Sequence, residues 1–581
     1  MSDSSGAEQN TPAMCKLLSR WLPPVRKRIT ITLRALALVL CVLSLAGSGL
    51  AQQRGRGGFG PSRSSYGWPG TKRVPSPSPT PTRTPAPGSV VISIDASKRH
   101  QVWEGFGAST EQWSDCGNDQ IGSSRVPLWR AIYGQSGVGL TMGDLHVNPY
   151  ELTYPNGGCG WKAQSRRNDD NDPNNFNWAG FNFRDSDAMK KDLVDIAQPL
   201  GFNNYMIRGG VSTRYQDPWL NDIRAQNYDL YLQEAAENVV APLRRWKDLY
   251  GIVPRFDQPM NEPLTGNNEL FGANKEEVVD IVKAVGAKLK AEGLNIKLVV
   301  PSEETEEASL EDARAILADP QARQYVGAIA FHTYPYESIY ANIGNVLNTS
   351  GAGKPDAGRI AIRNQIRSLA AQYGLEVWMT EVCCGGANFF DTLRGRAIHI
   401  HDEMVYTDVS SYWGMFNTGP DTNNNTEDGI STFGSGTFRI TGMGRAMGHY
   451  SHVIKQGAIR VDASSGDPLV QVVAFRDDMR GKLGLVIINN AAVSKSVSVA
   501  ISGVTVSGNF NGEQSTAAAF WRPVTANTQI TLPALSVTSL SGNTGAAPSP
   551  TPTPISTPTP ASTPAPSPGP SLSPSPTLRF E

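Results

Sequence analysis

Short apolar runs rich in β-formers alternate with longer amphipathic runs over the middle of the chain, from about residue 89 to residue 450. Such alternation is typical of parallel strands joined by crossover helices. Eight strand-like runs predict a (β/α)8 barrel, which is an α/β fold. They begin at Glu104-Gly105-Phe106-Gly107, Gly139-Leu140-Thr141-Met142, Tyr205-Met206-Ile207-Arg208, Arg255-Phe256-Asp257-Gln258, Ile296-Lys297-Leu298-Val299, Ala328-Ile329-Ala330-Phe331, Glu376-Val377-Trp378-Met379 and Ser411-Tyr412-Trp413-Gly414.

Helical periodicity fills the intervals between these strands. Apolar residues share one helical face in three runs, with Gly293 and Gly374 placed to end the second and third helices. Pro242 lies inside a fourth run, residues 228–250, and is expected to kink that helix or end it early. The three sets are Met189, Leu193, Ile196 and Leu200; Val278, Val282, Val285 and Leu289; and Ile362, Ile366, Leu369 and Tyr373.

Beyond the barrel the pattern changes to short alternating strands separated by turn residues, such as residues 469–475, 484–488 and 497–501. This predicts a small β-sandwich over residues 451–545 beside a barrel of residues 89–450. The first strand, within residues 89–103, lacks a helix of its own. We therefore expect it to pair with the sandwich.

Both ends of the chain differ in composition from the middle. A basic cluster, Arg26-Lys27-Arg28, precedes an apolar run and the small-residue site Gly49-Leu50-Ala51, so residues 1–51 are predicted to be a secretory signal peptide. A membrane anchor is the alternative, but the apolar core is shorter than the roughly 20 residues that a spanning helix needs. Residues 52–88 form a Pro/Gly/Ser-rich linker and residues 546–581 a Pro/Ser/Thr-rich tail. These features predict a secreted protein, extracellular or periplasmic, which the tail could attach to the cell envelope.

Charge and cysteine content narrow the classes of ligand and chemistry. Lys and Arg total 52 against 53 for Asp and Glu, so no long-range field gathers nucleic acid or anionic membranes, and a neutral ligand is favoured. Beyond the leader only Cys116, Cys159, Cys383 and Cys384 remain, which allows one or two disulfides after export. The adjacent Cys383 and Cys384 lack a His and Asn partner for thiol chemistry, so they are interpreted as part of a loop.

Two glutamates stand at the ends of predicted barrel strands. Glu262 follows the fourth strand in Met260-Asn261-Glu262-Pro263, and Glu381 ends the seventh strand. The carboxyl ends of barrel strands point at the active site. Cleavage of a glycosidic bond needs a proton donor and a carboxylate facing the anomeric carbon, about 5 to 5.5 Å apart in retaining enzymes. The two glutamates could supply this pair across the barrel mouth.

With these motifs the chain resembles clan A glycoside hydrolases, and glycoside hydrolase family 30 in particular. Families 5 and 39 share the two-glutamate arrangement and remain alternatives. The resemblance spans residues 90–540. It rests on the two glutamates and on Gly105-Phe106-Gly107-Ala108, Ala330-Phe331-His332-Thr333-Tyr334 and Leu532-Pro533-Ala534-Leu535-Ser536-Val537.

The resemblance implies that Glu262 is the catalytic acid/base and Glu381 the nucleophile. Asn261 is expected to bind the sugar 2-hydroxyl, Tyr334 to orient Glu381, and His332 to line the same pocket. Two tryptophans are candidates for sugar platforms, because an indole face suits the C–H face of a pyranose. They are Trp413, with a core tryptophan as the alternative, and Trp113, where ordinary packing is favoured.

The chain departs from the family pattern near the second strand, among other places. Members of the family usually carry an arginine near the end of the second strand, whereas this chain reads Thr141-Met142-Gly143-Asp144-Leu145-His146. The paired histidines, His399 with His401 and His449 with His452, form no ligand pattern, so no metal site and no cofactor are predicted.

The sequence thus predicts a retaining O-glycosyl hydrolase that cleaves a β-linked polysaccharide of the xylan, β-glucan or galactan type. A carbohydrate-binding pseudoenzyme displayed on the cell surface is the alternative. A surface structural protein, suggested by the low-complexity ends, is a third possibility.

Overall fold

The computed structural model describes most of the region between the two Pro-rich segments. The chain divides into two units, Met1–Thr80 and Pro81–Glu581, and every described residue lies in the second. In this part of the chain, no helix combines the length and the apolar character that crossing a membrane requires. The predicted leader, the linker, the tail, Trp113, Cys116, Cys159 and Cys384 lie outside it. The described residues are 89–109, 122–146, 151–152, 163–164, 170–181, 183, 193–208, 211, 218–266, 270, 272–334, 355–383, 388–420, 429–434 and 436–544.

An eight-stranded parallel sheet forms the barrel, in the order β2-β11-β10-β9-β8-β7-β6-β3. A parallel bridge between Ser109 and Asp144 joins the two outer strands and closes it. All eight predicted strands are present. The second begins at Met142 rather than Gly139, because the Leu140 amide bonds Ile132 O of the preceding helix. The strands are β2 Gly105–Ala108, β3 Met142–His146, β6 Asn204–Arg208, β7 Phe256–Gln258, β8 Lys297–Glu303, β9 Val326–His332, β10 Glu376–Glu381 and β11 Ser411–Gly414.

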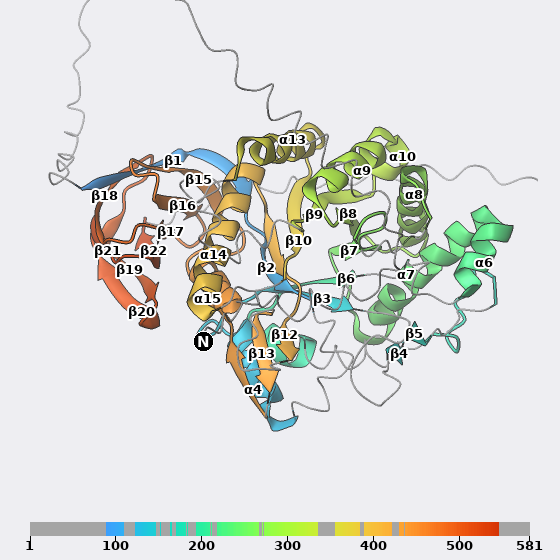
Figure 1. Cartoon of the computed structure of the whole chain (residues 1–581). Helices are drawn as coiled ribbons and strands as arrows, with labels where there is room; N and C mark the ends of the chain where they lie inside the picture. Colours follow the sequence, from blue (N-terminus) through green and yellow to red (C-terminus); the bar gives the residue numbers. More distant parts are fainter. Residues whose placement is uncertain are drawn as a thin grey trace, which may run out of the picture. The chain divides into compact units, whose positions relative to one another are not determined.

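Helices connect successive strands and cover the outside of the barrel, as α8 and α9 do beside β7 to β9 (Figure 1). The runs predicted at residues 278–289 and 362–373 lie in α8 and α13, and Gly374 ends α13 with a φ of 66°. Between β3 and β6, the described elements are the short strands β4 Glu151–Leu152 and β5 Ala163–Gln164, a π-turn, Leu193–Ala197, and a 3-10 turn, Gln198–Leu200. The α-helices are α4 Arg125–Tyr133, α6 Pro218–Gln226, α7 Tyr228–Tyr250, α8 Lys275–Ala291, α9 Glu306–Ala318, α10 Pro320–Arg323, α13 Ala357–Tyr373, α14 Phe389–Asp402 and α15 Gly442–Ser451.

Helix α7 continues through Pro242 for 23 residues, so the early end expected there does not occur. Asn227 caps its start by accepting the Leu230 amide at 3.1 Å, and Gly251 ends it with a φ of 66°. Its middle is buried, Pro242 included. Burial of this helix outweighs the roughly 3 kcal/mol that an interior proline costs.

A second, mostly antiparallel sheet of nine strands forms a β-domain in the order β20-β19-β22-β17-β16-β15-β1-β18-β21. The first strand, β1, lies antiparallel to β15 and parallel to β18. Apolar side chains from eight of these strands form a core of their own. The strands are β1 Val90–Val102, β15 Ile459–Ser465, β16 Val470–Asp477, β17 Lys482–Asn489, β18 Lys495–Ser502, β19 Ser507–Thr516, β20 Ala519–Ala526, β21 Gln529–Leu532 and β22 Ser536–Asn543.

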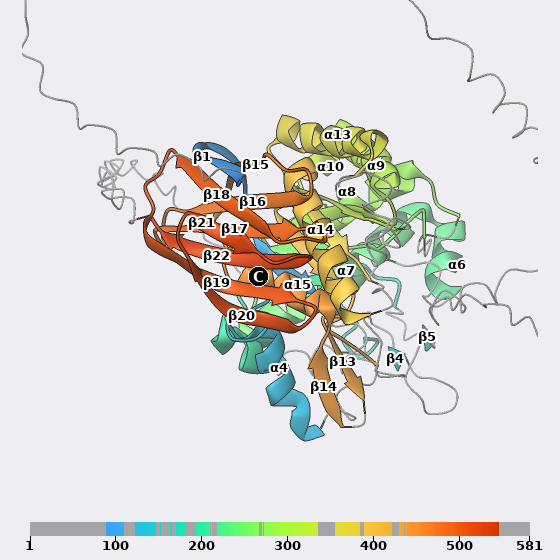
Figure 2. The ribbon, with the colours of Figure 1, turned by 60° about the vertical axis from the view of Figure 1, so that its left-hand side comes forward.

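Helices α14 and α15 lie alongside this sheet (Figure 2), and histidines on them bond to its strands. His401 Nε2 lies 3.2 Å from Val472 O, and the His449 ring lies between the hydroxyls of Ser539 and Ser515 at 3.0 and 2.7 Å. His452 Nδ1 lies 2.9 Å from Glu513 Oε2. These histidines connect the barrel helices to the β-domain.

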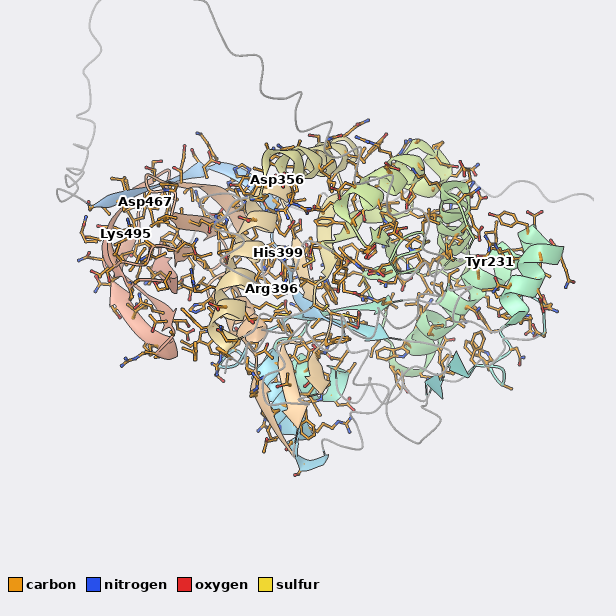
Figure 3. The ribbon with its side chains drawn as sticks, viewed as in Figure 1. Tyr231, Asp356, Arg396, His399, Asp467 and Lys495 are labelled. Atoms are coloured by element: carbon orange, nitrogen blue, oxygen red, sulfur yellow. The ribbon has the colours of Figure 1, made fainter. Side chains whose placement is uncertain are left out.

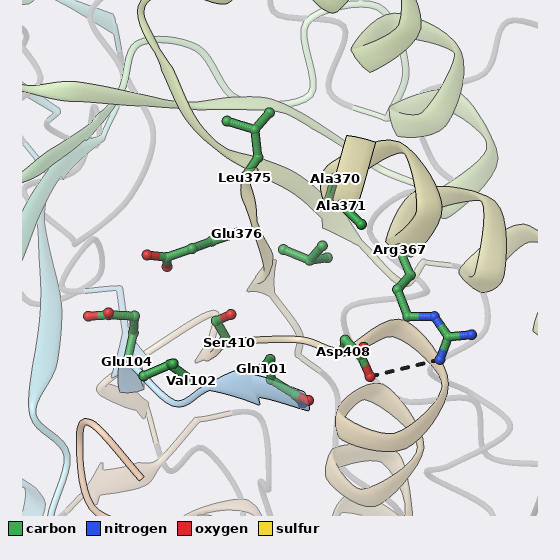
Figure 4. A pocket seen from close by; sticks show the side chains of 11 residues that line it. Gln101, Val102, Glu104, Arg367, Ala370, Ala371, Leu375, Glu376, Asp408 and Ser410 are labelled. Carbon is green, nitrogen blue, oxygen red and sulfur yellow. Dashed lines mark ion pairs between the residues drawn. The ribbon is translucent and has the colours of Figure 1, made fainter. Parts of the chain in front are cut away.

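A cavity of about 410 Å³ lies at the N-terminal end of β2, β10 and β11 (Figure 4). It is lined by Glu104 and Glu376 on one side and by the Arg367–Asp408 ion pair, 3.9 Å long, on the other. Burial, together with the charge of Glu104, raises the pKa of Glu376 to about 7. Catalytic sites of such barrels lie at the opposite end of the strands, so this cavity is separate from the candidate site described below.

A buried ion network ties three barrel helices together. Arg363 of α13 bonds Glu306 of α9 through Nε at 2.7 Å and Glu403, directly after α14, through Nη2. Arg359 also bonds Glu306. Burial raises the pKa of both glutamates against the opposing pull of the arginines. Arg396 and His399 lie together on α14 at 3.0 Å (Figure 3), and His399 Nε2 lies 3.3 Å from Glu403.

We predict that Arg363→Met lowers the free energy of unfolding by about 3 to 5 kcal/mol, because it leaves buried carboxylates without their central cation. Arg367→Met on the same helix removes a partly exposed arginine with a long ion pair, so it is expected to cost less than about 1 kcal/mol. Urea unfolding of both variants measures the difference. Equal costs would show that the network does not stabilise the helix packing.

Candidate active site

Glu262 and Glu381 lie at the C-terminal ends of two barrel strands, with 4% and 3% of their surface exposed. Glu381 is the last residue of β10, and Glu262 follows β7 by four residues. Ligand atoms of Glu262, Glu381 and His332 all lie within 4.8 Å of one another. The barrel therefore brings together the two carboxylates that the sequence analysis singled out.

Arg208 lies between Glu381 and a second acidic residue. This arginine ends β6, and its Nε lies 2.9 Å from Asp144 Oδ2 while its Nη1 lies 2.5 Å from Glu381 Oε2. Its Nη2 donates to Thr380 O at 2.7 Å. Arg208 was not among the site residues predicted from the sequence, although it ends a predicted strand. It comes from β6, which lies beside β3 in the barrel.

The charge state of Glu381 follows from these neighbours. Burial alone would raise the pKa of its carboxyl, but His332, Arg208 and the Tyr334 hydroxyl together lower that pKa below its usual value. Tyr334 OH donates to Glu381 Oε1 at 3.1 Å. Glu381 is therefore held as a carboxylate that accepts two hydrogen bonds.

His332, at the end of β9, connects the two glutamates to Ser302 of the neighbouring strand β8. Its Nδ1 lies 3.0 Å from Glu262 Oε1 and 4.0 Å from Glu381 Oε1. Its Nε2 lies 3.0 Å from the Ser302 hydroxyl, which in turn lies 2.7 Å from Thr380 Oγ1. The chain of contacts runs from β8 through His332 to the carboxylates and fixes the imidazole ring.

The remaining predicted site residues differ in their placement. Asn261 is buried beside Glu262, and its Oδ1 accepts from Gln258 Nε2 at 3.1 Å. Trp413 has the environment of the alternative, a core tryptophan: it lies fully buried in the inner core of the barrel, stacked on Trp378 at 6.1 Å, and donates to Ser411 Oγ. It occupies the third position of the short strand β11, where the side chain points into the barrel. Trp113 lies outside the described residues.

The geometry of the site also bears on metal binding and on thiol catalysis. Glu262, His332 and Glu381 could offer three ligand atoms to a metal ion. The Arg208 guanidinium already supplies a positive charge 2.5 Å from Glu381, which favours acid–base chemistry over metal binding. Cys383 is disulfide-bonded, which removes it as a thiolate nucleophile.

The Glu262 carboxylate lies directly against the backbone of Gly266. Gly266 has a φ of +52°, and a Cβ built there would come within 2.4 Å of Glu262 Oε2. Gly272 has a similar φ of +73°, but nothing lies within 4 Å of its Cβ position. The first glycine is thus required by both conformation and space, the second by conformation alone.

We predict that Gly266→Ala destabilises the protein by roughly 1 to 3 kcal/mol more than Gly272→Ala, since both introduce a left-handed alanine but only the first displaces Glu262. Chemical denaturation measures both costs. In a Glu262→Ala background the excess should fall, because the clashing oxygen is gone. An excess that persists unchanged would place the clash elsewhere, such as at the Glu304 Cβ 3.0 Å away.

Comparison with known proteins identifies the fold. No family model and no curated protein matches the chain. Among solved structures, the catalytic domain of GH30 xylanase C from Talaromyces cellulolyticus matches with a TM-score of 0.55 and 18% identity, covering 78% of this chain and 100% of that one. The glycoside hydrolase family 30 subfamily 8 xylanase from Clostridium acetobutylicum matches at 0.53 and 20%, covering 78% and 99%. The endo-β1,6-glucanase BT3312 matches at 0.53 and 18%, covering 78% and 94%. The chain shares the barrel-plus-β-domain fold of these glycoside hydrolases.

Proposed function

We propose that this protein is a secreted, retaining glycoside hydrolase of clan A, similar to family 30, that cleaves β-linked polysaccharide. The observation that carries the proposal is the pair of buried carboxylates, Glu262 and Glu381, whose oxygens approach within 4.8 Å. Retaining glycosidases hold their carboxyl groups about 5 to 5.5 Å apart, whereas inverting enzymes separate them by about 6.5 to 9.5 Å to admit a water. The short separation favours double displacement.

In the first step the Glu381 carboxylate attacks the anomeric carbon and the bond to the leaving oxygen breaks. Glu262 gives its proton to that oxygen, which leaves as an alcohol, and a glycosyl ester forms on Glu381. In the second step Glu262, now a carboxylate, removes a proton from water as the water oxygen attacks the anomeric carbon. Glu381 departs as a carboxylate, and the sugar keeps its original configuration.

The neighbours of the two glutamates support this division of roles. Arg208 and Tyr334 bind the charged form of Glu381, which suits Glu381 to the role of nucleophile and leaves the acid/base role to Glu262. Gln258 occupies the Asn261 Oδ1 atom, which leaves the Asn261 amide nitrogen to donate to a sugar hydroxyl. Donors of this kind stabilise the oxocarbenium-like transition state when they bind the 2-hydroxyl.

The proposed substrate class and cellular location are supported by features outside the site. Two of the structural neighbours are described as xylanases and one as an endo-β1,6-glucanase. The nearly balanced charge suits an uncharged polymer, of the xylan, β-glucan or galactan type. The predicted leader places the enzyme outside the cytoplasm, where such polymers occur, and the Pro-rich tail offers a tether to the cell envelope.

We predict that the purified protein releases reducing sugar from at least one polymer in a panel of xylans, β-glucans and galactans. Glu381→Gln should lower the rate on the order of 10³-fold or more, because it removes the nucleophile while preserving shape. Proton NMR of the first product should show the retained anomer. Inverted product would contradict the nucleophile assignment, and saccharide binding without release by the wild type would indicate a carbohydrate-binding pseudoenzyme.

The charge of Arg208 should set the acid limit of activity. Glu381 must be ionised to attack, and Arg208 helps to lower its pKa, so activity is lost as pH falls through that pKa. In Arg208→Met the pKa rises, and the acid limb of kcat/KM should move up by about 1 to 3 pH units. Arg208→Lys, which keeps a positive charge, should move it less. An unchanged limb in both variants would mean that another group sets the acid limit.

A further inference from the structure

The C-terminal end of β8 holds the loop that carries Glu262. Three consecutive residues there, Ser302, Glu303 and Glu304, contact residues 262–266, here called the Glu262 loop. Neither glutamate was a candidate from sequence, because nothing in the run 302–304 distinguishes it from a charged strand end. Glu303 ends β8 and Glu304 follows it; β8 lies next to β7, from which the Glu262 loop emerges.

Glu303 is the main anchor of this loop. It is fully buried, and its two oxygens accept three hydrogen bonds from the loop. Oε1 accepts the Leu264 amide at 2.9 Å, and Oε2 accepts the Thr265 amide at 3.0 Å together with the Thr265 hydroxyl. Thr265 Oγ1 then accepts the Glu304 amide at 3.2 Å. The loop is thus bonded to β8 through both backbone and side chain.

Helix α9 supports Glu303 from behind. The Ser309 hydroxyl accepts the Glu303 amide at 3.1 Å. Burial, together with a hydrogen bond to Glu303 and the charge of that residue, raises the pKa of Asp312 to about 8. A protonated Asp312 can donate to Glu303 and leave both oxygens of that carboxyl able to accept from the loop.

The loop is held in a backbone conformation that it would not adopt unaided. Glu262 has a φ of +43° and Ser302 a φ of +65°. The Glu262 amide donates to Ser302 O at 2.9 Å, so the two left-handed residues are bonded to each other. Each costs roughly 1 to 2 kcal/mol relative to ordinary backbone. Such conformations persist only where the surroundings fix them. Glu303 makes three of the hydrogen bonds that fix this loop.

We propose that Glu303 is a positioning residue for the acid/base Glu262: it anchors the Glu262 loop to β8 so that the Glu262 carboxyl is held at the leaving oxygen. The inference rests on the proposed function and adds a residue that does not touch the substrate. General acid help matters when the leaving group is a poor one and contributes little when the leaving group departs as a stable anion. Loss of Glu303 should therefore appear selectively with poor leaving groups.

The test compares two aryl β-glycosides of the same sugar, one with phenol and one with 2,4-dinitrophenol as the leaving group. The sugar is chosen as the one that the wild type cleaves from a panel of β-xylobiosides, β-cellobiosides, β-gentiobiosides and β-galactobiosides. For Glu303→Gln we expect kcat/KM on the phenyl glycoside to fall about 10²-fold, and on the dinitrophenyl glycoside less than about 3-fold. Thr265→Val removes one of the three bonds to Glu303 and the bond from the Glu304 amide without touching a fully buried residue, and it should show the same selectivity with a smaller loss. Thr265→Ser keeps the hydroxyl and should restore the phenyl rate.

Amide hydrogen exchange provides a readout that does not depend on activity. In Glu303→Gln, the amides of Leu264 and Thr265 should exchange faster than in the wild type. Equal losses on both glycosides, or no loss on either, would overturn the positioning role while leaving the proposed function intact. A wild-type enzyme that cleaves neither the glycosides nor any polymer of the panel would overturn the proposed function, and with it the positioning role. In that case exchange would still report whether Glu303 holds the loop.

Discussion

Two carboxyl groups within 4.8 Å of each other in a buried site cannot both carry charge without compensation, and the rest of the site follows from this constraint. Arg208 and Tyr334 stabilise the charge on Glu381, and His332 lies against Glu262. Asp144 in turn pairs with Arg208. The two glutamates become chemically different although they share a residue type, which is what separate roles as nucleophile and acid/base require.

The barrel makes this arrangement possible because each contributing residue lies in the middle or the C-terminal half of a different strand. Asp144 and Arg208 come from β3 and β6, Ser302 from β8, and His332 and Glu381 from β9 and β10. Parallel strands direct all of these side chains to one end of the sheet. The Arg363 network among α9, α13 and the residues after α14 lies on the outside and holds the strand connections in place. The chemistry and the supporting ion network are thus separated in space.

The sequence predicts the barrel well because its strands are short apolar runs with clear boundaries, and all eight are found. It predicts Glu262 and Glu381 because each follows such a run. It does not predict the contacts between strands. Arg208 bonds Glu381, which lies 173 positions away in the sequence, and Glu303 bonds Thr265, which lies 38 positions away. The sequence left two environments open for Trp413, a sugar platform and the core, because its position in β11 decides which way the ring points, and one residue of register changes that direction. The early end that was one of the two expectations at Pro242 does not occur for a related reason, since tertiary burial outweighs a local preference.

The strained backbone at Glu262 and Ser302 shows where the fold gives up local stability for geometry. A glutamate in the left-handed backbone conformation is unfavourable anywhere in a chain. Its occurrence at one of the two candidate catalytic carboxyls indicates that the surrounding structure fixes the backbone there. The conformation turns the Glu262 carboxylate onto Gly266, where only a glycine leaves room. The same turn brings the amides of Leu264 and Thr265 onto Glu303. The left-handed backbone, the glycine that leaves room for the carboxylate and the buried Glu303 anchor therefore converge on Glu262, while the Glu381 carboxylate, at the end of β10, is held by Arg208 and Tyr334.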